Sequence, residues 1–317
     1  MIFARAVEKG SREKAPLPKP GTLFAPHLHH LGRKQFHSVK HQRTVSASRK
    51  AKASLYKKVQ EGLALLFFDT VELFYSNSRI SKFFQEAVAV TAKQVQIGNR
   101  PCRIYGTDCA EYLLLQMTDE HKLQNMDSEV EAIAQGSAHS FLFAAVLVKS
   151  WNDELSPWEA PAVWGKESFN GKAADTLRFL TEQVIPTLKQ QFALPENVKI
   201  ILGGYSLAGL FALWASTQTD LFYGVAAASP SVWFPGWMEF EQQHPIQAQR
   251  IYLSLGDREE RTRNAAMAAV GDNIRALHHE LAGRSKDCTL EWNNGGHFKD
   301  TDLRTARAFR WAMEDMR

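Results

Sequence analysis

A serine, a group of carboxylates and a histidine follow one another along the second half of the chain in an order that suits nucleophilic catalysis. Ser206 lies in V-K-I-I-L-G-G-Y-S-L-A-G, residues 198–209, where a short apolar run stops at two glycines shortly before the serine. This pattern is typical of a strand, a sharp turn and the start of a helix. A serine hydroxyl is a weak nucleophile on its own, so Ser206 requires a histidine base and an acid that orients the base.

The segment around Ser206 matches the G-x-S-x-G pattern with one departure. The fifth position is Ala208, and Gly209 follows it. Small residues at Gly204 and Ala208 would let the strand and the helix approach each other at a turn where the serine takes strained backbone angles. The alternative is a tight turn beside a buried strand, without a catalytic role. A helix that begins at Leu207 would place free amide groups beside Ser206 and favours the catalytic interpretation.

The candidate base is His297, in N-N-G-G-H-F after a strand expected at 289–292. Two glycines would let this loop carry an imidazole across the end of the sheet, and imidazole is the usual general base near neutral pH. His244, His278 and His279 stand in polar or helical segments, and we expect them to be surface residues.

The candidate acid lies in G-D-R-E-E-R, residues 256–261, after a strand expected at 251–255. Asp257 is closest to the strand end, Glu259 follows, and Glu260 is also explained as a solvated charge beside arginines. We prefer Glu259 and keep Asp257 as the alternative. The order serine, acid, histidine is that of the α/β-hydrolases.

An oxyanion hole needs a pair of donors aimed at the substrate carbonyl oxygen. The amide of Leu207, first in its helix, is a natural donor. We expect the second in K-S-W-N-D-E, after a strand at 141–148. The backbone amide of Trp151 is our assignment, with Ser150 and Asn152 as alternatives.

The segments G-Y-S-L-A-G, G-D-R-E-E and G-G-H-F, in this order, resemble the Putative esterase family of α/β-hydrolases, which is similar to formylglutathione hydrolase, feruloyl esterases and esterases that open ferric enterobactin. The resemblance covers about residues 94–316. It implies a serine hydrolase that acts on carboxylic esters, with the acid third after a glycine in G-x-x-[DE]. Glu259 has this spacing from Gly256, although aspartate is commoner there.

Alternating strands and helices position these residues. We expect strands at 95–97, 103–105, 112–117, 141–148, 198–202, 225–228, 251–255 and 289–292, and helices at 174–192, 207–215, 264–281 and 302–316. This order predicts an α/β-hydrolase fold with a mostly parallel central sheet and helices on both faces. Ligands of such sheets bind beyond the carboxyl ends of the strands, where Ser206, the acid loop and His297 are all expected.

Charge divides the chain into unequal parts. Residues 1–58 hold 14 lysines and arginines against 2 glutamates, whereas the whole chain has a net charge of only +4. We therefore predict a basic, disordered extension at 1–53, an amphipathic helical segment at 54–92 and the α/β-hydrolase catalytic domain at 93–317. The histidines and cations of the extension are best explained as a solvated tail, and no nucleic-acid partner is expected for the catalytic domain.

The composition of the chain bears on the cellular compartment and on the cofactors that we expect. The chain of 317 residues has 3 cysteines without metal-ligand spacing, which predicts free thiols in a reducing compartment, the cytoplasm by default. No apolar run approaches the roughly 20 residues that span a bilayer, and no secretory signal is recognisable. No metal or organic cofactor is implied, and nothing indicates an oligomeric state.

Aromatic residues gather after two of the expected strands: Trp151, Trp158, Trp164, Trp233, Phe234 and Trp237. They predict either a pocket for a bulky acyl group or loops packed against the sheet. The overall expectation is a small-molecule esterase, with an aromatic or siderophore-like ester as substrate, acting through an acyl-enzyme on Ser206. The alternatives are a non-catalytic binding protein of the same fold and an acyltransferase with the same triad.

Overall fold

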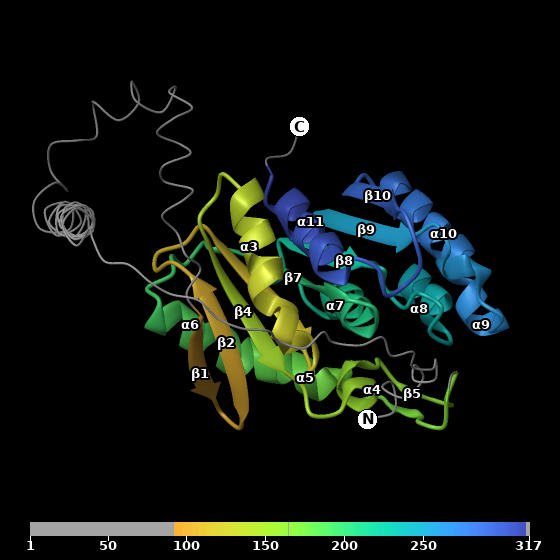
Figure 1. The fold of residues 1–317 in the computed structure, drawn as a ribbon, viewed down its shortest axis with the longest axis horizontal. Coiled ribbons are helices and arrows are strands. Elements are labelled where there is room, and N and C mark those ends of the chain that lie inside the picture. Colours follow the sequence, from red (N-terminus) through yellow and green to blue (C-terminus); the bar gives the residue numbers. More distant parts are fainter. Residues whose placement is uncertain (1–91, 164, 315–317) are drawn as a thin grey trace, which may run out of the picture. The chain divides into compact units, whose positions relative to one another are not determined.

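A twisted eight-stranded sheet organises the chain, and its strand order is β1-β2-β4-β3-β7-β8-β9-β10 (Figure 1). The computed structural model describes residues 92–163 and 165–314. The strands are β1 (Lys93–Ile97), β2 (Arg100–Gly106), β3 (Tyr112–Thr118), β4 (Phe141–Leu147), β7 (Lys199–Tyr205), β8 (Gly224–Ala228), β9 (Arg250–Gly256) and β10 (Asp287–Asn293). The pairs β1–β2 and β2–β4 are antiparallel and the other pairs are parallel, which confirms the mostly parallel sheet.

Helices cover both faces of this sheet. On one face lie α3 (Met126–Gly136) and α11 (Thr301–Met313), which pack against each other (Figure 1). The other face is covered by α5 (Ala173–Phe179), α6 (Ile185–Gln191), α7 (Leu207–Gln218) and α10 (Val270–Gly283). Shorter elements are η1 (Lys122–Asn125), α4 (Trp151–Leu155), β5 (Glu159–Ala160), β6 (Phe169–Asn170), α8 (Trp237–Gln243), η3 (Glu259–Arg261) and α9 (Ala265–Ala268).

Strand β7 shows why the centre of the sheet is apolar on both sides. Ile201 faces the core under α3 and α11, whereas Ile200 and Leu202 face the core under α7. All three side chains are buried. Each such side chain contributes about 1.5–3 kcal/mol when it leaves water, so burial on both faces explains the continuous apolar run in the sequence.

The predicted end of this strand at residue 202 is too early. Gly203 and Gly204 continue the strand, and Gly203 pairs with Gln116 of β3 and Ala226 of β8. A Cβ atom at Gly203 would lie 2.5 Å from the Phe309 ring of α11. A Cβ atom at Gly204 would likewise lie 2.6 Å from the Cβ atom of Ala208 in α7, so the close helices leave no room for side chains at these two strand positions.

Two predicted helices are divided, and three others were not predicted. The helix expected at 174–192 contains a π turn at Leu180–Val184, just before Pro186, which lacks an N–H to continue regular pairing. The helix expected at 264–281 is divided into α9 and α10 at Ala269. Helices α3, α4 and α8 were missed because they are short or carry polar residues among few apolar ones.

Several predictions concern residues that are not described. The extension at 1–53, all but residue 92 of the segment at 54–92, Trp164 and residues 315–316 lie outside the described residues. All three cysteines lie inside them, and each is a free thiol, as predicted. Of the helices that are described, none is both long and apolar enough to cross a membrane.

Candidate active site

Ser206 occupies a strained turn between β7 and α7. Its backbone angles are φ 62° and ψ −122°, which a residue with a Cβ atom rarely adopts. The turn is held from the next strand, because the Ser206 amide donates to the carbonyl of Ala228 (3.1 Å) and the Ser231 amide donates to the carbonyl of Ser206 (3.1 Å). The strained backbone leaves the Ser206 side chain partly exposed at the carboxyl end of the sheet.

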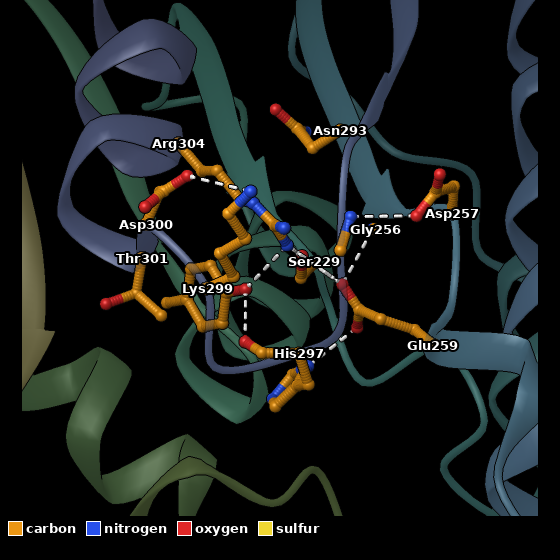
Figure 2. Close-up of polar contacts among 12 residues, drawn as sticks. Ser229, Gly256, Asp257, Glu259, Asn293, His297, Lys299, Asp300, Thr301 and Arg304 are labelled. Carbon is orange, nitrogen blue, oxygen red and sulfur yellow. Dashed lines mark hydrogen bonds and ion pairs between the residues drawn. The ribbon is translucent and has the colours of Figure 1, made fainter.

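His297 lies between Ser206 and Glu259. Its Nε2 atom is 3.0 Å from Ser206 Oγ, and its Nδ1 atom is 2.6 Å from Glu259 Oε2. Figure 2 shows Glu259 pointing at the imidazole. An ionised carboxylate can only accept, so Nδ1 donates in this contact, and in the neutral imidazole Nε2 is then the acceptor for the serine hydroxyl. The fold thus brings together three side chains from loops far apart in the sequence.

The other oxygen of Glu259 is held by a dense set of donors. Oε1 accepts from the Gly256 amide (2.7 Å), from Ser229 Oγ (2.8 Å) and from Arg304 Nη1 (3.2 Å). The Glu259 side chain is only 5% exposed. A buried carboxylate needs such partners, and they leave Oε2 directed at His297.

Neither competing carboxylate contacts His297. Asp257 Oδ1 accepts from the amide of Gly295 at 2.7 Å, and in Figure 2 this side chain lies apart from the imidazole. Glu260 forms an ion pair with Arg275 at 2.9 Å. Asp257 therefore shapes the loop that carries His297, and Glu260 is a paired surface charge.

Arg304 was not predicted from the sequence. It lies in α11 with 1% of its side chain exposed and contacts Glu259. A signal was available, because Arg304 falls on the same helical stripe as the buried residues Ala308 and Ala312. A cation on an apolar stripe indicates a buried partner.

The amides predicted for the oxyanion hole lie at helix starts. Leu207 is the first residue of α7 and Trp151 is the first of α4, so neither amide has an acceptor within its helix. Helix α4 packs against α7. The Ser150 amide, however, donates to Glu154 Oε1 at 3.0 Å, so it is already engaged.

The order of the strands in the sheet indicates another candidate source for the second amide of the oxyanion hole. Strand β3 lies between β4 and β7, so the loop after β3 is nearer in the sheet to the Ser206 turn than the loop after β4 is. The two loops meet where Lys122 Nζ lies 3.6 Å from the centroid of the Trp151 ring. Asn152, the remaining alternative, lies in the same short helix as Trp151.

The aromatic cluster serves mainly as packing. Trp237 and Phe234 are buried, and Trp158 packs against Phe234 with ring centroids 5.6 Å apart. By contrast, Phe298 is 81% exposed and its ring meets that of His297 edge to face at 5.2 Å. Among the described residues, no group of three or more His, Cys, Asp and Glu side chains is arranged to hold a metal ion.

Comparison with known proteins identifies the family of this chain. A family model described as "Putative esterase" matches residues 121–300, which is more than half of the chain. No match was found among curated proteins.

Solved structures with the same arrangement of strands and helices include three hydrolases. An IroE-like serine hydrolase from Shewanella oneidensis is 15% identical over 69% of this chain and 79% of its own, with a TM-score of 0.58. The siderophore hydrolase EstB from Aspergillus nidulans is 16% identical over 72% of this chain and 95% of its own, with a TM-score of 0.56. The enterobactin esterase FES from Shigella flexneri is 17% identical over 70% of this chain and 59% of its own, with a TM-score of 0.53. At these identities the similarity concerns the fold, which is the α/β-hydrolase fold.

Proposed function

The chain belongs to the Putative esterase family and is an enzyme that hydrolyses esters, and from this premise we propose that it is a serine esterase with a Ser206–His297–Glu259 triad. One observation carries the proposal: the unbroken series of contacts from Glu259 through His297 to Ser206, at 2.6 and 3.0 Å. The strained turn at Ser206 supports its role as the residue of a nucleophile elbow.

The mechanism follows from the protons that these contacts can move. His297 Nε2 takes the proton of Ser206 as Oγ attacks the ester carbonyl carbon, and Glu259 stabilises the imidazolium that forms. The tetrahedral intermediate collapses, the alcohol leaves with the proton from the imidazolium, and an acyl-enzyme on Ser206 remains. Water, activated by the same imidazole, then releases the acid and restores the hydroxyl.

The oxyanion would be stabilised by backbone amides. We propose the Leu207 amide as one donor, because it is unpaired within α7 and adjoins Ser206. The Trp151 amide stays our assignment for the second, and amides of residues 119–121, after β3, are the competing source because β3 adjoins β7 in the sheet.

We propose siderophore esters and aromatic esters as the first substrates to examine. Two structures of similar fold are described as a siderophore hydrolase and an enterobactin esterase. The exposed ring of Phe298 beside His297 suits an aromatic group on the substrate. The three free cysteines support a reducing compartment, and we propose the cytoplasm.

Hydrolysis of short p-nitrophenyl esters by the wild type and by Ser206→Ala tests the nucleophile. We expect kcat to fall by about 10⁴-fold or more, because Ser206 Oγ is the hydroxyl that contacts the base, His297 Nε2. A fluorophosphonate probe should label the wild type and Ser231→Ala, which removes the nearby hydroxyl 3.4 Å from Ser206 Oγ, but not Ser206→Ala. Equal rates in the wild type and Ser206→Ala would overturn the proposal.

A further inference from the structure

We propose that Arg304 is a positioning residue for this triad, because its buried guanidinium joins the three segments that carry the nucleophile, the acid and the base. The inference rests on the triad proposed above. It adds a residue from the last helix, α11, that touches none of the reacting atoms and acts through its neighbours.

The guanidinium donates to acceptors on four segments. Nη1 lies 3.1 Å from the Tyr205 hydroxyl oxygen, 3.2 Å from Glu259 Oε1 and 3.4 Å from Ser229 Oγ. Nη2 lies 3.4 Å from the carbonyl oxygen of Asn294. Figure 2 shows Arg304 reaching from its helix into the space between Ser229 and Glu259. Arginine suits this place because its planar head presents several fixed donors at once.

Tyr205 extends this link to the nucleophile and the base. It directly precedes Ser206, and its hydroxyl donates to the carbonyl oxygen of His297 at 2.6 Å. Burial raises the pKa of Tyr205 to about 12, so the phenol keeps its proton over the whole working pH range. Arg304 and Tyr205 together therefore connect the end of β7, the acid loop and the histidine loop.

Burial of Arg304 and Glu259 fixes the orientation of the Glu259 carboxylate. Arg304 is 1% exposed and Glu259 is 5% exposed, so neither charge can exchange its partner for water at low cost. With Oε1 occupied by Arg304, Ser229 and the Gly256 amide, the carboxylate presents Oε2 to His297. A buried apolar side chain at position 304 would fill space but would not hold this orientation.

The test compares Arg304→Ala, Arg304→Lys and Arg307→Ala on a short p-nitrophenyl ester. Arg307 is the matched control, an arginine of the same helix that pairs with Glu291 at 3.3 Å and does not contact the triad. We expect Arg304→Ala to lower kcat by about 100-fold at a nearly unchanged KM, because a misplaced triad slows chemistry more than binding. Arg304→Lys keeps the charge but lacks the planar set of donors of the guanidinium, so we expect it to have an intermediate kcat.

Chemical rescue separates positioning from simple loss of structure. Millimolar guanidinium should raise kcat of Arg304→Ala by about tenfold, whereas urea, a neutral molecule of similar shape, should not. If Arg304→Ala does not fold, Tyr205→Phe supplies the test, with kcat lowered by about tenfold at unchanged KM. Variants of Arg304 that behave like Arg307→Ala would overturn the inference. Full activity in Ser206→Ala would instead overturn the proposed function.

Discussion

Two carboxylates lie two residues apart after β9, and their orientations separate their roles. Glu259 faces His297, whereas Asp257 accepts from the Gly295 amide. We expect Glu259→Gln to lower kcat by about 10²- to 10⁴-fold, because a neutral amide cannot stabilise the imidazolium and can impose the wrong tautomer. We expect Asp257→Asn to lower kcat by less than about tenfold, because the amide oxygen of the new side chain can still accept from the Gly295 amide.

Steady-state kinetics on one ester, with circular dichroism to check folding, measures both effects. The assignment of the acid would be wrong if Asp257→Asn lowered kcat more than Glu259→Gln did.

The sequence placed the acid in this loop because the loop follows a strand in the chain order of hydrolases. The spacing from Gly256 favoured Glu259 but left Asp257 open, because the orientation of the two side chains depends on η3, which turns Glu259 back toward Gly256.

At the scale of elements, the packing of β7 against α7 depends on two small residues. A Cβ atom at Gly204 would lie 2.6 Å from the Cβ atom of Ala208. We expect Gly204→Ala to lower the free energy of unfolding by about 1–3 kcal/mol through overpacking. Ala208→Gly removes the nearest opposing atom but costs about 1 kcal/mol in a helix.

Urea unfolding of the wild type, both single variants and the double variant forms a cycle for this pair. The two substitutions should be less damaging together than the sum of their separate effects, with a coupling of about 1 kcal/mol. Strict additivity would show that the contact does not limit the approach of the two elements. The sequence pattern predicted that small residues are needed here, and the distance identifies which atoms would collide.

The sequence predicted the strands of the sheet well because each is a short apolar run between polar or glycine-containing segments. Helices with mixed composition were harder to predict. Helix α3 buries Met126, Val130 and Ile133 but also Glu129, so its apolar stripe is interrupted. Arg304 was missed for a related reason, since only the completed fold shows that the acid loop provides its partner.

At the scale of the whole molecule, one buried acid links the sheet to its helical cover. Glu129 of α3 is almost fully buried, and Oε2 accepts from Gln116 Nε2 of β3 at 3.4 Å. Burial raises the pKa of Glu129 to about 8, and the nearby charge of Asp302 acts in the same direction. The folded protein therefore holds a proton that the unfolded chain releases above its ordinary pKa of 4.5.

This difference makes the free energy of unfolding depend on pH in a defined window. Between about pH 5 and 8 the folded state binds more protons at this site than the unfolded state, so stability falls as pH rises. Burial lowers the pKa of Lys122 to about 8, so its own effect falls mainly at higher pH. Burial also raises the pKa of Glu241, but that contribution is common to the wild type and a Glu129 variant.

Glu129→Gln should remove much of this decline. The neutral amide keeps the size of the side chain and has no proton to lose, so we expect the variant to gain more than about 1 kcal/mol on the wild type as pH rises from 5 to 8. Urea unfolding at several pH values measures the difference, and Glu131→Gln, an exposed position of the same helix, is the matched control. Parallel stability curves for the wild type and Glu129→Gln would show that Glu129 is ionised in the folded protein. In that case Lys122, rather than a bound proton, would balance the carboxylate, because its ammonium is close enough to lower the pKa of Glu129.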